Sequence, residues 1–335
     1  MGHGSDFEHI PIVDVSDLVA GRASQRAVAN QLGDACRESG FFYVVGHGVD
    51  QDLQRRLHEL SREFFALDVD TKLKIRMALG GRAWRGYFRV GGELTSGKPD
   101  QKEGLYFGAE LPPDDPRVGA GTPLHGPNLF PEKPEGLRSA VLAYMAALTA
   151  LGHRLMAGLA LSLGLEESYF ADHGMAEPLT LFRIFNYPPP ADLGLGLWGV
   201  GEHTDYGLLT ILLQDDAGGL EVRSRSRWVP APPVVGSFVC NIGDMLDRMT
   251  GGRYRSTPHR VRNPAPRDRL SFPFFFDPNF FAPVRPIELP GRDLPPDDRD
   301  ERWDRSSVHE FQGTYGDYLL GKVGKVFPEL RSSVL

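Results

Sequence analysis

Two histidines and one aspartate of this chain have the identities and spacing of metal ligands. His203 and Asp205 lie in the segment GEHTDYGLLTIL, and His259 lies further along in STPHRV. Residues i and i+2 of a strand point to the same side, so His203 and Asp205 can project together, and a returning strand can bring His259 beside them. Two imidazoles and one carboxylate can occupy one face of an iron(II) ion and leave three positions open for chemistry. The three residues therefore predict an oxygen-using enzyme rather than a binding module.

An arginine and a serine after the third ligand predict an anion site. Arg269 and Ser271 lie in RDRLSFPFFFDP, a strand-like run in which both side chains should point the same way. A guanidinium grips a carboxylate in bidentate fashion, and a hydroxyl supplies another donor. Taken alone, such residues are more often a structural ion pair and a serine on a sheet face. Beside an open metal, they indicate a site for a small dicarboxylate or a substrate carboxylate.

Other assignments remain open for these motifs. Zinc also accepts two histidines and a carboxylate, so a zinc hydrolase is one alternative, and a non-catalytic binding protein on the same fold is another. The run Gly194–Gly199 matches the glycine pattern of a dinucleotide site, but PPPADL precedes it and no helix follows it. We interpret that run as a flexible lip beside the metal.

Composition excludes several classes of partner. The chain has 335 residues, a net charge of −7 and no basic block, so nucleic acid is not an expected partner. The two cysteines, Cys36 and Cys240, lie in apolar sequence without a CxxC motif, which favours a reducing cytoplasm. We see no signal peptide and no apolar run of about 18 residues, so we expect no membrane span. The sequence carries no indication of oligomeric state.

Hydrophobic periodicity predicts a helical first half and a β-rich second half. Many short β-type runs separated by turn residues follow from residue 179 to residue 286, at the spacing of a sandwich or barrel. The region 80–134 shows no period and reads as loop with a short strand or two. Neither an internal repeat nor a linker divides the chain, so we expect a single domain over 1–335, with 1–165 mainly helical. The expected helices are 25–38, 52–67, a long central helix over 139–163, and 308–323 near the C-terminus.

These motifs together resemble the isopenicillin N synthase-like group of 2-oxoglutarate- and iron(II)-dependent oxygenases. HTDYGLLTIL is similar to its HxD segment, STPHRV to its distal-histidine segment and RLS to its RxS motif. Similar too are IPIVDVS, GFFYVVGHG, FNYPPP and VCNIGDML, so the resemblance covers nearly the whole chain in the family's order. The resemblance implies a distorted double-stranded β-helix (jelly roll) with flanking helices, an α+β, mainly β fold.

The resemblance also implies roles for individual residues. His203, Asp205 and His259 would bind iron(II), while Arg269, Ser271 and Tyr187 of FNYPPP would bind the distal carboxylate of the cosubstrate 2-oxoglutarate. Plant members typically have an asparagine two residues before that tyrosine, where this chain has Phe185. Any cosubstrate contact from that position is therefore in doubt.

The implied reaction consumes dioxygen and 2-oxoglutarate, releases succinate and carbon dioxide, and hydroxylates, desaturates or cyclises a small-molecule metabolite. The alternative is a relative that does not use 2-oxoglutarate and whose substrate itself ligates iron. A small polar or acidic substrate is the expectation, because arginines and aromatic residues cluster in strands and loops near the motifs. The candidate substrate-pocket residues are Arg183, Phe274, Phe276, Tyr87 and Arg85.

Overall fold

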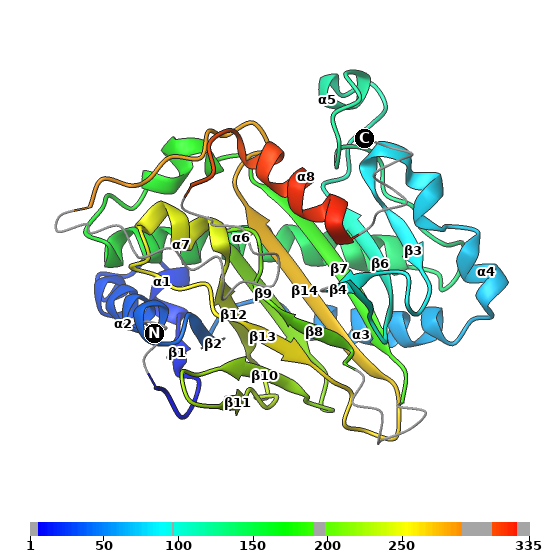
Figure 1. Cartoon of the computed structure of the whole chain (residues 1–335), viewed down its shortest axis with the longest axis horizontal. Coiled ribbons are helices and arrows are strands. Elements are labelled where there is room, and N and C mark those ends of the chain that lie inside the picture. Colours follow the sequence, from blue (N-terminus) through cyan, green and yellow to red (C-terminus); the bar gives the residue numbers. More distant parts are fainter. Residues whose placement is uncertain (1–5, 96, 190–197, 290–309, 327–335) are drawn as a thin grey trace.

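Two facing β-sheets form the centre of the protein, with helices covering one side (Figure 1). The computed structural model describes residues 6–95, 97–189, 198–289 and 310–326. Most core side chains are aliphatic or aromatic, and they fill the space between the large sheet and the long helix behind it. This arrangement is the predicted jelly roll with flanking helices and one long central helix.

The larger sheet has eight strands and joins both halves of the chain. Its central pairs are antiparallel, whereas the edge pair β1 and β2 is parallel. In spatial order the strands are β1 Ile12–Asp14, β2 Phe41–Val45, β12 Phe238–Ile242, β9 Leu209–Gln214, β14 Arg269–Asp277, β7 Leu179–Tyr187, β6 Glu103–Gly108 and β3 Gly86–Phe88.

The smaller sheet has four antiparallel strands and carries two of the three candidate metal ligands. Its strands β8 and β13 pair so that His203 lies directly opposite His259. A separate hairpin, β4 Leu94–Thr95 and β5 Lys98–Pro99, lies beside β8. The four strands in order are β11 Trp228–Pro230, β10 Leu220–Arg223, β13 His259–Val261 and β8 Val200–His203.

Helices pack mainly behind the large sheet. The longest, α6, contacts α2, α3, β14 and β9, so it packs across the back of the large sheet (Figure 1). The helices are α1 Ser16–Val19, α2 Gln25–Glu38, α3 Gln51–Phe65, α4 Val69–Leu73, α5 Pro116–Gly119, α6 Leu137–Ser162, α7 Asp244–Thr250 and α8 Tyr315–Val326, with a 3₁₀ segment at Met77–Ala83 and a π turn at Ala171–Met175.

The α6 helix begins slightly earlier than predicted. Gly136 is its N-cap, in the left-handed conformation at φ 88°, and Ser139 lies inside the first turn, where its hydroxyl donates to the Gly136 carbonyl. By length and composition alone α6 could cross a membrane, although no such segment is expected from the sequence. Half of that apolar window is buried within the protein, which is the environment of a core helix.

Two predicted segments differ from the observed structure. The region read as loop with a short strand or two contains β3 and the β4–β5 hairpin in addition to β6 and α5. The last helix begins at Tyr315 rather than near residue 308, because the Thr314 amide and hydroxyl both donate to Asp317 and cap the helix there. The predicted start at 308 lies outside the described residues.

Candidate metal centre

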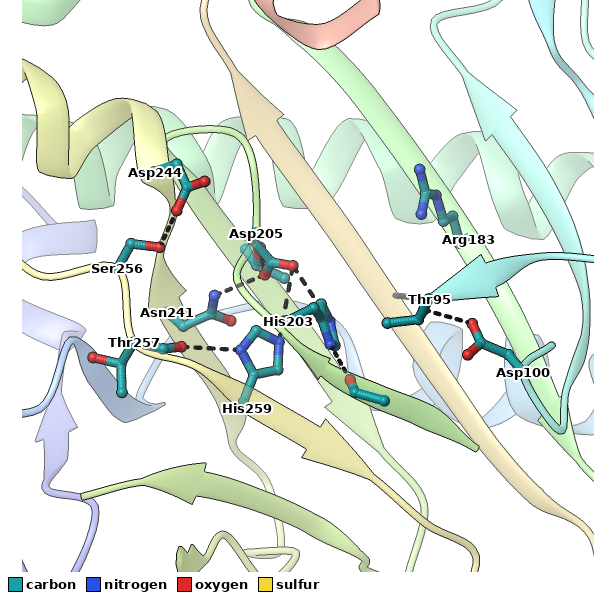
Figure 2. Close-up of polar contacts among 12 residues, drawn as sticks. Thr95, Asp100, Arg183, His203, Asp205, Asn241, Asp244, Ser256, Thr257 and His259 are labelled. Carbon is teal, nitrogen blue, oxygen red and sulfur yellow. Dashed lines mark hydrogen bonds and ion pairs between the residues drawn. The ribbon is translucent and has the colours of Figure 1, made fainter. Parts of the chain in front are cut away.

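His203, Asp205 and His259 converge at the mouth of the jelly roll (Figure 2). One ligand atom from each lies within 4.8 Å of the others, the spacing needed to surround a single ion. Asp205 Oδ1 is 3.9 Å from His203 Nε2 and 3.8 Å from His259 Nε2, and the two imidazole centroids are 4.2 Å apart. The predicted convergence of the three residues is therefore present in the fold.

Hydrogen bonds leave one ligand atom of each residue free to bind a metal. His203 Nδ1 lies 2.8 Å from the Gly201 carbonyl oxygen, and His259 Nδ1 lies 3.2 Å from that of Thr257, so the Nδ1–H tautomer points each Nε2 at the ion site. These contacts set the ring orientations before any metal binds.

The Asp205 carboxylate is oriented in the same way. Its Oδ2 accepts hydrogen bonds from Thr210 Oγ1 at 2.5 Å and Asn241 Nδ2 at 2.7 Å, which leaves Oδ1 for the metal. Neither supporting residue was singled out from the sequence. The available signal was a polar side chain with an apolar residue on each side, Thr210 in LTILLQ and Asn241 in FVCNI.

Burial and mutual contact set the charge state of the three groups. Burial lowers the pKa of His203, and burial together with the neighbouring imidazole lowers the pKa of His259 to about 4. Burial raises the pKa of Asp205, but the two histidines and its hydrogen bonds outweigh burial and hold that pKa below its usual value. Neutral imidazoles and an ionised carboxylate are the forms that bind a divalent metal, so the donor set fits iron(II).

A pocket opens directly over the three ligands. It contains about 1000 Å³ of space, the open solvent at its mouth included. Strands of both sheets, the β4–β5 hairpin and Leu319 of α8 line it. Its polar and charged lining residues are Glu93, Thr95, Lys102, Arg183, Tyr187, His203, Thr204, Asp205, Tyr206, Thr210, Asn241, His259, Ser271 and Asp277.

Arg269 is a fully buried cation with unused donors. Its Nε donates to the Gly218 carbonyl, and its guanidinium lies 4.8 Å from the centre of the Tyr187 ring. Both terminal nitrogens, Nη1 and Nη2, are buried without a hydrogen-bond partner. A buried guanidinium in this state is costly unless an anion binds it, so the geometry fits the carboxylate of a cosubstrate.

Tyr187 and Ser271 lie beside Arg269 as the sequence predicts. Arg269 pairs with Tyr187, and Ser271 with Phe185, across the β7–β14 ladder, so all four side chains lie on one face of the sheet. Ser271 and Tyr187 line the pocket, and burial raises the pKa of the Tyr187 phenol, which keeps it protonated as a donor. The doubtful position, Phe185, offers only a ring, and Lys102 Nζ lies 4.8 Å from its centre.

Lys102 belongs to a buried charge cluster that the sequence analysis missed. Its Nζ lies 2.8 Å from Glu93 Oε2 and 2.5 Å from Asp100 Oδ2, and Asp100 also accepts from Thr95 (Figure 2). Glu93 Oε1 further accepts from the Tyr106 hydroxyl. These residues come from the region read mainly as loop, where no motif marks them.

Arg183 is the one expected substrate residue that the structure brings to the pocket. Phe274 and Phe276 are fully buried on the opposite face of β14, because side chains alternate along a strand, and Phe276 packs against His153 of α6. Phe275 is the phenylalanine of β14 that lines the pocket. The expectation for Phe274 and Phe276 was wrong.

The other two expected substrate residues lie away from the metal pocket. The Tyr87 hydroxyl donates to Glu103 within the core, and Arg85 is buried with Nη2 donating to the Leu124 carbonyl. Neither lines the pocket, so the structure differs from the prediction for both. Of the run interpreted as a flexible lip, 194–197 lies outside the described residues.

The comparisons with known proteins agree with this geometry. Residues 10–133 match a family model described as the N-terminal part of a non-haem dioxygenase in morphine synthesis, and residues 178–278 match the 2OG-Fe(II) oxygenase superfamily. A probable iron/ascorbate oxidoreductase of Dictyostelium discoideum is 50% identical over 98% of both chains. The chain belongs to the 2OG-Fe(II) oxygenase superfamily. It is therefore an oxidoreductase whose cofactors are iron(II) and 2-oxoglutarate.

Relatives of this oxygenase have several different substrates. The 1-aminocyclopropane-1-carboxylate oxidase of Dictyostelium mucoroides is 38% identical over 97% of this chain and 96% of the relative. A homoarginine-6-hydroxylase of Oryza sativa subsp. japonica is 40% identical over 85% and 90%. Among solved structures, a full-length Neurospora crassa protein in complex with alpha-KG superimposes with a TM-score of 0.77 at 27% identity, covering 94% of this chain and 96% of that one.

Proposed function

We propose that this oxygenase hydroxylates a C–H bond of a small metabolite and couples that reaction to oxidation of 2-oxoglutarate. The balanced reaction consumes substrate, dioxygen and 2-oxoglutarate, and forms hydroxylated substrate, succinate and carbon dioxide. The observation that carries the proposal is the buried guanidinium of Arg269, whose terminal nitrogens have no partner and which packs on Tyr187 of the pocket that the three metal ligands line.

The chain's own residues would bind, orient and shield the reactants. His203 Nε2, Asp205 Oδ1 and His259 Nε2 would hold iron(II), which supplies the activation of dioxygen when bound. Arg269, with the hydroxyls of Ser271 and Tyr187, would hold the carboxylate of 2-oxoglutarate that lies farther from the iron. The apolar residues of the lining exclude bulk water, which strengthens these charge–charge contacts and limits side reactions.

A second function is worth testing because of one relative. The 1-aminocyclopropane-1-carboxylate oxidase is 38% identical along almost the whole chain. The alternative is an iron(II) oxidase that does not consume 2-oxoglutarate and whose substrate binds the metal, with Arg269 holding a carboxylate of that substrate or another anion.

Amino acids are the first substrates to test. Both 1-aminocyclopropane-1-carboxylate and homoarginine, which the relatives' names print, are amino acids. We further infer a single catalytic domain acting on a small molecule in a reducing, cytoplasmic compartment. The two buried free cysteines support that compartment.

The decisive experiment measures succinate formation and oxygen consumption together. Purified protein is loaded with iron(II) and ascorbate under air, and succinate from labelled 2-oxoglutarate is measured across an amino-acid panel. Succinate formed in proportion to oxygen and to hydroxylated product supports the proposal. Product formation without any 2-oxoglutarate requirement supports the alternative instead, and activity that persists under nitrogen contradicts both.

A further inference from the structure

An arginine and an aspartic acid that line the metal pocket have hydrogen-bonding capacity that the protein does not use. Arg183 lies on β7 and Asp277 at the end of β14, and both line the pocket from the face that carries Ser271. Neither was needed to bind iron or 2-oxoglutarate. The question is which ligand would satisfy both.

Arg183, labelled on β7 in Figure 2, is held between two aromatic rings and is only loosely paired. Its guanidinium lies between the rings of Tyr106 and Phe275, with 4.1 and 4.8 Å from the central carbon to the ring centroids. Its nearest carboxylate oxygen is Glu93 Oε1 at 3.7 Å, and its Nε is buried without a hydrogen-bond partner. A planar cation fixed by two rings is well prepared to bind a carboxylate.

Asp277 is the matching acid. Asp277 is only 3% exposed, and its Oδ2 accepts a hydrogen bond from the Tyr315 hydroxyl at 2.6 Å. Its Oδ1 is buried without a hydrogen-bond partner, and burial raises the pKa of this carboxyl to about 7, although the Tyr315 hydroxyl and the Leu208 amide act in the opposite direction. This oxygen lies against the backbone of Gly207, two residues after Asp205, where an added Cβ would be only 1.5 Å from it. Because Gly207 has no side chain, the Asp277 carboxyl can lie close to the metal site.

The two groups do not satisfy each other. Among the described residues, the only ion pair of Arg183 within 4.0 Å is the one with Glu93, and Asp277 has none. Glu93 is already engaged by Lys102 and Tyr106. A ligand with only one charged group would leave Arg183 or Asp277 buried without a full complement of partners, which costs free energy.

We propose that the substrate is a free amino acid whose carboxylate binds Arg183 and whose ammonium group binds Asp277. We call these two residues the zwitterion clamp. The inference rests on the proposed function and adds the substrate class and the residues that recognise it. The amino-acid side chain would then extend over the apolar lining toward the three metal ligands.

Blocked amino acids test the clamp directly. The probes are L-homoarginine, L-lysine and L-leucine, each also as the N-acetyl derivative, which removes the α-ammonium charge, and as the amide, which removes the carboxylate charge. Binding is measured by calorimetry on full-length protein loaded with manganese(II) and 2-oxoglutarate, so that no turnover occurs. We expect at least one free amino acid to bind about 10- to 100-fold more tightly than either blocked form, the range for loss of a charged hydrogen bond.

Two variants separate the two contacts. Arg183→Gln should abolish discrimination between the free acid and its amide while keeping discrimination against the N-acetyl form. Asp277→Asn should do the reverse. Arg138→Gln and Asp34→Asn remove an exposed arginine and an exposed aspartate outside the pocket, and both should keep the wild-type ratios. Because each result is a ratio measured on one variant, partial misfolding does not imitate it.

The outcomes distinguish this inference from the proposed function. Equal binding of free and blocked forms, or no binding of any of the three amino acids, overturns the clamp even if succinate forms with another substrate. Discrimination that follows the two variants supports the clamp even if no succinate forms, in which case the proposed function fails alone.

Discussion

Replacement of Arg269 tests the assignment of the cosubstrate site most directly. Its Nη1 and Nη2 are buried without partners, so both are available to one carboxylate. A hydrogen bond to a charged group contributes about 1.5–3 kcal/mol, so two such bonds contribute about 3–6 kcal/mol. At about 1.4 kcal/mol per tenfold change, Arg269→Gln should raise the dissociation constant of 2-oxoglutarate by roughly 10²- to 10⁴-fold. Arg269→Lys should have a dissociation constant between those of wild type and Arg269→Gln, because an ammonium keeps the charge but not the bidentate geometry.

The same variant should behave differently without ligand. The wild-type protein carries an unpaired buried charge, so unliganded Arg269→Gln should be at least as stable as wild type. The assay is calorimetric titration of 2-oxoglutarate into the metal-loaded protein, together with thermal unfolding with and without ligand. Arg138→Gln, which removes an exposed arginine of α6 paired with Glu110, is the matched control. An unchanged dissociation constant in Arg269→Gln would refute the reasoning.

Three further predictions follow from single contacts. Thr210→Val removes the 2.5 Å hydrogen bond to Asp205 and should weaken metal affinity about 10- to 100-fold, as measured by competition with a chelator; unchanged affinity would contradict the orienting role. Gly152→Ala puts a Cβ 2.3 Å from a phenylalanine ring of β14 and should lower the free energy of unfolding by about 1–3 kcal/mol, whereas Gly321→Ala, where nothing lies within 4 Å, should not lower it. Burial lowers the pKa of His153, so as pH falls through about 6.5 the unfolded chain takes up a proton that the folded chain does not. Stability of the metal-free protein in urea should therefore fall on acidification, and His153→Gln should reduce the slope.

The metal ligands could be found from the sequence because two of them are close neighbours in the chain and the third lies on a strand that pairs with theirs. His203 and Asp205 are two residues apart at the end of a strand, and the pairing of β8 with β13 brings His259 opposite His203. The supporting hydroxyl and amide were not found, because a single threonine or asparagine in an apolar strand has many possible roles. Only the fold shows that Thr210 and Asn241 reach the same carboxylate oxygen.

The region before α6 was harder to predict for a physical reason. The strands β3 and β6 form because β6 pairs with β7, a partner far away in sequence. The local hydrophobic pattern does not indicate such long-range pairing. Lys102 and Glu93 are buried because they pair with each other and with neighbouring groups. A charge pattern read along the chain places both residues in solvent, where most unpaired charges are found.

Strand alternation distinguishes two neighbouring phenylalanines and gives the last prediction. The rule that places Arg269 and Ser271 on one face of β14 also places Phe275 there and Phe276 on the other face. Phe276 is fully buried against α6, so Phe276→Ala should lower the free energy of unfolding by about 3–5 kcal/mol. Phe275→Ala should lower it less, because that ring is only partly buried, but it removes one of the two rings that hold Arg183. Denaturant unfolding measures the loss of stability of each variant, and amino-acid titration measures the loss of ligand binding. A larger change in ligand binding for Phe276→Ala than for Phe275→Ala would contradict the assignment of the pocket to the face of β14 that carries Phe275.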